Sequence, residues 1–208
     1  YTNLGLKLMG YDCADDFTKA YDLTDKRRLT IAKNDEELAR HARVVTCVAD
    51  SLVQLQKSRN PNCHRIPNGV DWEMFSSSGE AWDLRKACAL PEDVKLLGYA
   101  GDLSYRVDMG LIDYLLESRP DWVFVAVGPA RGTLPTRGNA RYLGEVPLAK
   151  VPAFLRGVDI CLLPHKVDPF TDSMSPLKLF DYLAVGKPVV ATRVAGATEL
   201  SEVVYLAD

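Results

Sequence analysis

The sequence predicts an α/β fold built on parallel sheets. Short apolar runs alternate with helical stretches along all 208 residues, and this alternation is typical of parallel α/β architecture. Gly101, Gly128 and His165 follow directly on, or close behind, three of the apolar runs. Ligands of open parallel sheets bind at the carboxyl ends of the strands, so we expect these residues around one pocket, together with Ser175.

The first third of the chain predicts the end of one domain. Its pattern indicates strands at 6–11, 44–48 and 64–66, a polar helix at 26–42, and a second helix capped by Asp50 or Ser51. After these elements, Pro67-Asn68-Gly69 predicts a turn, because Asn and Gly both tolerate positive φ. We therefore predict one domain over residues 1–70 and another over 71–208.

The alternation is clearest after Asp93. Apolar and β-branched runs predict strands, and the amphipathic stretches between them predict helices. The predicted strands are 96–100, 123–127, 141–143, 158–163, 188–191 and 203–206, and the predicted helices are 109–118, 148–157 and 176–185.

The last of these helices indicates a site. Ser175 is a good N-cap, Pro176 fits the first helical position, and Leu177, Phe180, Leu183 and Ala184 fall on one face. Free N–H groups and the positive end of the dipole favour a phosphate there. Lys178 opposes that dipole unless an anion binds, and Asp181 is an acceptor suited to sugar hydroxyls.

Composition excludes several classes of protein. The chain has 25 Lys and Arg against 28 Asp and Glu, for a net charge of −3. This balance gives no indication of a basic surface that would bind nucleic acid. The five cysteines are scattered without a Cys-x-x-Cys pair, which indicates neither a disulfide framework nor a zinc site. No apolar run approaches the ~18 residues that span a bilayer, and no signal-peptide layout is present. We expect a soluble, cytoplasmic protein.

Four blocks of sequence, in order, resemble the C-terminal half of retaining GT-B glycosyltransferases, especially bacterial members that build cell-surface polysaccharides. The resemblance covers about residues 66 to 200. The blocks are Ile66-Pro67-Asn68-Gly69-Val70-Asp71 with Phe75, Tyr99-Ala100-Gly101 with Asp108 and then 120–129, 142–159, and the helix block from Ser175 to Ala191.

The resemblance implies two Rossmann-like domains, the second of which binds a UDP- or GDP-sugar. Transfer of a hexose to a saccharide or lipid-linked acceptor is implied, with retention of configuration and without an obligatory metal or other cofactor. At 208 residues the chain is short for such an enzyme, so we expect a fragment or a reduced form. Segments outside it are a possible route to peripheral membrane association.

The resemblance also implies roles for individual residues. Arg106 and Lys178 are expected to stabilise charge on the diphosphate, beside Gly101 and the helix start at Ser175, Pro176 and Leu177. Asp181 is expected on the ribose, Gly144, Glu145 and Val146 on the base, and His165 near the donor. Ser173 stands where the family carries the first acid of a pair, which is a departure.

Alternatives stay open at this point. A sugar-nucleotide 2-epimerase shares the scaffold, and the departure at Ser173 favours a non-catalytic nucleotide-binding module. A lone histidine such as His165 is more often structural than catalytic. The acidic turn with Asp12, Asp15 and Asp16 is more often a solvated cap than a metal site, so no metal ligands are predicted.

Overall fold

The computed structural model describes residues 9–207, and its contacts divide the chain into two compact units. The first unit comprises residues 1–68 together with Asp168–Ser175, and the second comprises 69–167 and 176–208. The predicted domain boundary at Val70 lies close to the division after Asn68. The sequence pattern did not predict that Asp168–Ser175 belongs to the first unit, because it placed these residues in the second domain.

The first unit holds a parallel sheet of three strands in the order β1-β2-β3. Cys13 of β1 pairs in register with Cys47 of β2, and both side chains belong to a small apolar core with Leu52. Residues 6–8 of the strand predicted at 6–11 lie outside the described residues, and its end overlaps β1 at Gly10 and Tyr11. The elements are β1 (Gly10–Cys13), η2 (Phe17–Lys19), α1 (Asp25–His41), β2 (Val44–Cys47), α2 (Asp50–Lys57), β3 (Cys63–Arg65) and η4 (Thr171–Ser173).

The N-cap predicted for α2 is wrong. Ala49 is the N-cap, its backbone is extended, and no side chain caps the helix. Asp50 instead lies in the first turn, where its charge is favourable to the helix dipole. Its carboxylate also pairs with Arg65 at 3.1 Å, so a partner on the neighbouring strand occupies the side chain that was expected to cap.

The second unit holds a six-stranded parallel sheet in the order β6-β5-β4-β7-β8-β9. The chain runs outward from β4 to β6 and then restarts on the other side of β4 with β7. This reversal is where open α/β sheets bind ligands. The strands are β4 (Lys95–Ala100), β5 (Trp122–Val127), β6 (Ala140–Tyr142), β7 (Ile160–Leu163), β8 (Val189–Thr192) and β9 (Tyr205–Ala207).

Every strand and helix predicted after Asp93 is found, with small shifts of its bounds. The predicted helix at 148–157 begins as a separate 3-10 turn, η3. The helices are α3 (Trp72–Ser76), α4 (Leu84–Ala87), α5 (Met109–Ser118), η3 (Leu148–Lys150), α6 (Val151–Gly157), α7 (Leu177–Ala184) and α8 (Ala195–Thr198). No helix in the described part of the chain is both long and apolar enough to cross a membrane.

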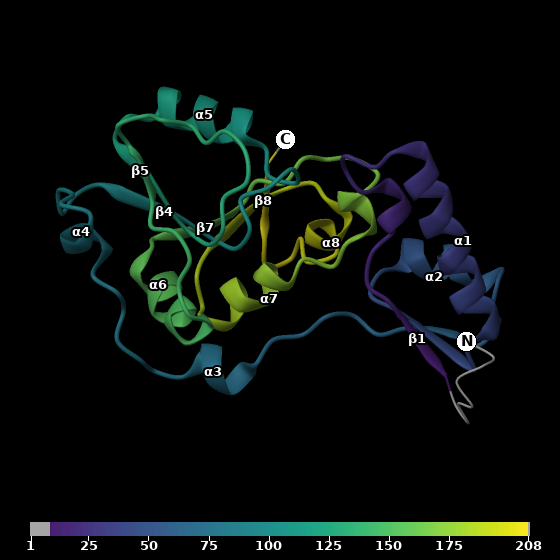
Figure 1. The fold of residues 1–208 in the computed structure, drawn as a ribbon. Helices are drawn as coiled ribbons and strands as arrows, with labels where there is room; N and C mark the ends of the chain where they lie inside the picture. The colour runs from purple at the N-terminus through teal and green to yellow at the C-terminus, as the bar shows by residue number, and fades with distance from the viewer. Residues whose placement is uncertain (1–8, 208) are drawn as a thin grey trace. The chain divides into compact units, whose positions relative to one another are not determined.

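Helices cover both faces of this sheet (Figure 1), with α5 on one face and α6 and α7 on the other. Successive side chains of a strand point to opposite faces. Leu97 of β4 accordingly packs with Ile112 of α5, whereas its neighbour Leu96 packs with Phe154 of α6 and Leu179 of α7. The two apolar layers fix α7 against the sheet with its first turn at the strand ends.

Candidate functional site

A pocket of about 310 Å³ opens in the second unit, at the carboxyl ends of β4 and β5. The loop after β6 and the first turns of α7 complete its wall. Its position next to the reversal in strand order matches the site expected for an open parallel sheet. The lining residues are Ala100, Gly101, Val127, Gly128, Pro129, Glu145, Val146, Leu148, Val151, Leu177, Lys178 and Asp181.

Two glycines form a part of the wall that no side chain could replace. Gly101 and Gly128 have φ of +139° and +129°, which other residues rarely adopt. A β carbon on Gly128 would lie 2.2 Å from the carbonyl oxygen of Gly101. The Gly101 N–H donates to Val127 O at 2.9 Å, which holds the two strand ends together. The resulting bare backbone lets a ligand group approach closely.

Lys178 places a cation over this backbone. A β carbon on Gly101 would lie 2.5 Å from its Cε, and its Nζ lies 5.4 Å from the ring centroid of Tyr99. The ammonium forms no hydrogen bond or ion pair with any described residue. Burial, together with the nearby charge of Arg106, lowers the pKa of Lys178 to about 8. An anionic ligand would therefore favour the protonated form of this ammonium.

Asp181 follows Lys178 by nearly one helical turn and lines the same pocket. Burial raises the pKa of its carboxyl to about 6, and the charge of Lys178 opposes that rise. The carboxylate is therefore ionised at neutral pH and can accept hydrogen bonds from hydroxyl groups. Acceptor and cation thus lie on one face of α7.

Two other predicted residues lie beside the pocket without lining it. Arg106 is half-buried in the loop after β4 and acts on Lys178 through its charge. Gly144 has φ of +74°, and its carbonyl accepts the N–H of Gly128 at 2.8 Å. Glu145 and Val146, which follow it, do line the pocket.

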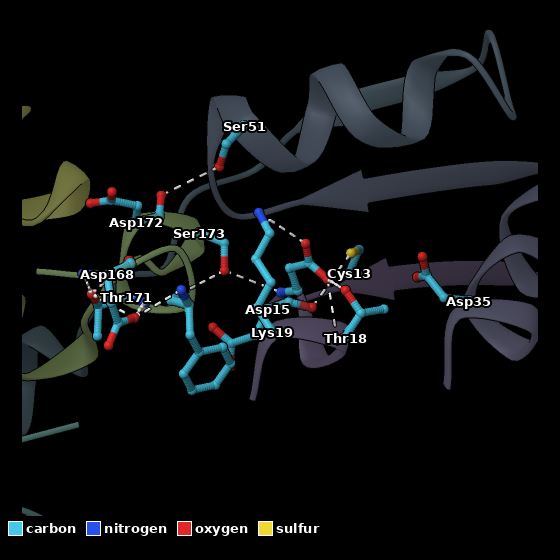
Figure 2. A network of polar contacts seen from close by, with 12 residues as sticks. Cys13, Asp15, Thr18, Lys19, Asp35, Ser51, Asp168, Thr171, Asp172 and Ser173 are labelled. Atoms are coloured by element: carbon cyan, nitrogen blue, oxygen red, sulfur yellow. Dashed lines mark hydrogen bonds and ion pairs between the residues drawn. The ribbon is translucent and has the colours of Figure 1, made fainter. Parts of the chain in front are cut away.

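The expectation that His165 and Ser175 surround the same pocket as Gly101 and Gly128 is wrong, because neither residue lines it. His165 is 2% exposed, and its backbone forms an isolated antiparallel β-bridge with Val107. The His165 carbonyl accepts the Thr192 hydroxyl at 2.6 Å. Ser173 and Ser175 belong to the first unit. The Ser173 hydroxyl is buried within the polar network that Figure 2 shows, and it donates to Phe170 O at 2.7 Å.

The start of α7 also differs from the prediction. Pro176 is the N-cap rather than the first helical residue, and no side chain caps the helix. Ser175 instead offers its carbonyl to Asn68 Nδ2 at 2.7 Å. The buried residues of the helix are Leu179 and Tyr182, whereas Leu177 is 56% exposed. Leu183 and Ala184 of the predicted face pack against the same core as Leu179 and Tyr182, so the periodicity indicated the buried side of the helix only in part.

A second pocket, of about 420 Å³, lies in the first unit and is lined mainly by apolar side chains of η2, α1 and α2. Several of its polar side chains bond to one another. Tyr11 donates to Asp35 Oδ1 at 2.5 Å, and Gln56 Nε2 donates to the same carboxylate at 2.9 Å. These groups are committed to internal structure, which makes this pocket the weaker candidate site.

Comparison with known proteins supports the assignment of the site. Residues 95–205 match the family model described as glycosyl transferases group 1. This match covers more than half of the chain and includes the whole lining of the 310 Å³ pocket. The chain belongs to the group 1 glycosyl transferases. The α/β fold with parallel sheets, predicted here as GT-B, is confirmed by the solved structures that resemble it.

Two relatives come from Bacillus subtilis, and both are named as teichuronic acid biosynthesis glycosyltransferases. TuaH is 28% identical over 209 residues, covering 92% of this chain and 52% of TuaH. TuaC is 31% identical over 139 residues, covering 65% of this chain and 34% of TuaC. The chain thus spans about half the length, or less, of these group 1 relatives.

A solved relative shares the fold. Anabaena HepE, crystallised with UDP and glucose, superposes with a TM-score of 0.73 at 21% identity. The match covers 96% of this chain and 57% of HepE.

The structural role of Tyr182 was not predicted from the sequence. The Tyr182 hydroxyl accepts the N–H of Ala100 at 3.0 Å, although the side chain is fully buried. It therefore ties α7 to the end of β4, directly before Gly101. A tyrosine within an apolar helix face is a weak signal for such a bond, because a buried hydroxyl needs a partner.

Proposed function

We propose that the whole protein is a glycosyltransferase that transfers a hexose from a nucleoside diphosphate sugar to a glycan acceptor. In this proposal the second unit binds the donor. The observation that carries it is the meeting of Lys178 and Asp181 with the bare backbone of Gly101 and Gly128 in one pocket.

In this proposal, different residues bind the diphosphate, the ribose and the base of the donor. Lys178 and the backbone at Gly101 bind the diphosphate, with Arg106 adding positive charge. Asp181 accepts hydrogen bonds from the ribose, and the base lies against Glu145 and Val146. As the glycosidic bond breaks, negative charge grows on the β-phosphate, so cations fixed there stabilise the transition state more than the ground state.

The comparisons support the finer parts of the proposal. The names of TuaH and TuaC favour an acceptor in cell-surface polysaccharide synthesis, either a saccharide or a lipid-linked one. The ligands of HepE favour a uridine donor over a guanosine one. The resemblance to retaining enzymes favours retention of configuration. Two cations close to the pocket favour transfer without an obligatory metal, and five free cysteines favour the cytoplasm.

Calorimetry of single variants tests the donor site. Lys178→Ala should lose one charge-assisted contact, about 1.5–3 kcal/mol of UDP affinity, with little effect on uridine. Asp181→Asn should weaken UDP and uridine alike, because both contain the ribose. Lys95→Ala is the matched control, since Lys95 is exposed at the opposite end of β4. Unchanged UDP affinity in a folded Lys178→Ala protein would reject the site.

Product analysis of the full-length protein tests the reaction. A sugar nucleotide incubated with a glycan acceptor should yield an extended glycan and free nucleoside diphosphate. Release of an altered sugar nucleotide without any acceptor would identify an epimerase instead. Tight nucleotide binding without turnover across a panel of acceptors would favour the non-catalytic module.

A further inference from the structure

The ammonium of Lys178 can serve a ligand only if it stays in the pocket before that ligand binds. Lysine has a flexible four-carbon side chain, and fixing it in one rotamer costs conformational entropy. Burial and the charge of Arg106 disfavour the charged form of Lys178, whereas the charges of Asp102 and Asp181 favour it. These charges influence the protonation of the group, and its close contacts determine its position.

The ring of Tyr99 is one such contact. Lys178 Nζ lies over this ring, 5.4 Å from its centroid, which is within the ~6 Å over which the face of an aromatic ring attracts a cation. Tyr99 is fully buried and belongs to the apolar layer with Ile112 and Phe124. Because neighbours enclose the ring, it cannot swing away from the lysine, and the attraction is stronger than at a water-exposed surface.

Tyr99 is also fixed at both of its ends. Its backbone pairs in register with Ala126 of β5, in the middle of the six-stranded sheet. Its hydroxyl donates to the carbonyl of Asp102 at 3.0 Å, one residue beyond Gly101. The side chain therefore contacts both parts of the proposed diphosphate subsite, the lysine through its ring and the glycine turn through its hydroxyl. All of these residues belong to the second unit.

We propose that Tyr99 is a positioning residue for the nucleotide site, and that its ring holds the ammonium of Lys178 over the backbone of Gly101, ready for a diphosphate. Tyr99 does not itself line the pocket. A ring that attracts the cation less strongly leaves the lysine in other rotamers for more of the time. The apparent affinity then falls with the fraction of molecules that have the ammonium in place. This inference rests on the proposed function of the pocket as a nucleotide site.

Fluorination of the ring at position 99 tests the inference in the full-length protein. Tyr99→Phe removes the hydroxyl and keeps the ring, and phenylalanines with a growing number of fluorine atoms then replace it. Fluorine withdraws electron density from the ring face and changes its shape little. UDP affinity at neutral pH, where Lys178 is protonated, should fall stepwise along the series, about fivefold or more in total. Uridine affinity should stay constant, because uridine has no phosphate for the lysine to bind.

Two controls show whether the ring acts through Lys178. Phe124 is fully buried in the same apolar layer, in the middle of β5, and its ring meets Tyr142 edge-on. The same fluorinated series at Phe124 should leave UDP affinity unchanged. In a Lys178→Ala background, the series at position 99 should also have no effect, because the cation that responds to the ring has been removed.

Calorimetry of the series distinguishes the ring from other causes. Constant UDP affinity along the series at position 99 would overturn the inference, and so would equal losses for UDP and uridine or a decline that persists in Lys178→Ala. A loss confined to the step from tyrosine to phenylalanine would assign the effect to the hydroxyl bond with Asp102, and it too would overturn the role of the ring. If the wild-type protein binds neither UDP nor GDP, the proposed function itself is rejected.

Discussion

The side chain of Lys178 lies across Gly101 so closely that a β carbon at Gly101 would stand 2.5 Å from Lys178 Cε. We predict that Gly101→Ala displaces the lysine and weakens UDP binding about tenfold or more, the loss of one charge-assisted contact. Gly132→Ala is the matched control, since Gly132 also has positive φ but its β carbon would meet nothing within 4 Å. Calorimetry of both variants separates displacement of Lys178 from backbone strain, and equal losses would contradict the prediction.

Gly128→Ala should act on stability rather than on Lys178. The new β carbon would meet the Gly101 carbonyl at 2.2 Å, and backbone cannot move aside as a flexible side chain can. Together with the strained φ of +129°, this should lower the free energy of unfolding by at least about 1–3 kcal/mol. Urea unfolding measures the change. Gly138→Ala, whose β carbon has open space, should stay close to wild type.

Donor affinity should depend on pH in both directions. Asp181 must be ionised to accept from the ribose, so affinity should rise as pH increases through about 6. Lys178 must be protonated to bind phosphate, so affinity should fall as pH increases through about 8. A nucleoside diphosphate sugar is the right probe, because it lacks the terminal phosphate that titrates near pH ~6.

Two variants test which residue causes the rise of affinity at low pH and which causes its fall at high pH. Lys178→Arg should remove the fall above pH 8, since a guanidinium stays charged there. Asp181→Asn should remove the acid limb and lower the affinity throughout. Calorimetry between about pH 5 and about pH 9.5, a range that brackets both pKa values, gives both curves. A flat wild-type profile would show that neither group touches the donor.

Tyr182→Phe should destabilise the second unit. The change leaves the Ala100 N–H without its hydroxyl partner, at a cost of about 1–3 kcal/mol. Thermal unfolding followed by circular dichroism measures the loss, and Tyr114→Phe on the exposed face of α5 serves as the reference. Identical melting of the two variants would mean that the hydroxyl contributes nothing to the attachment of α7.

Much of the second unit could be predicted because its signals are local. The run at β4 and the helix at α5 each show their own periodicity, and Gly101 and Gly128 follow strands whose polarity the α/β alternation already implies. Lys178 and Asp181 could be placed in the site for the same reason, since a short helical spacing brings them together. The N-cap of α7 was missed: Pro176 takes that position, and the carbonyl of Ser175 accepts a bond from Asn68, a residue far away in the sequence.

The sequence by itself determined the strands, the helices and the pairing of cation and carboxylate on α7, because backbone preferences and apolar periodicity act between near neighbours. Only the tertiary structure decided that Asp168–Ser175 joins the first unit and that Ser173 is committed to Asp16 and Phe170. It also decided that His165 is buried without lining the pocket. These outcomes depend on hydrogen bonds between segments distant in the chain, whose partners no local pattern specifies.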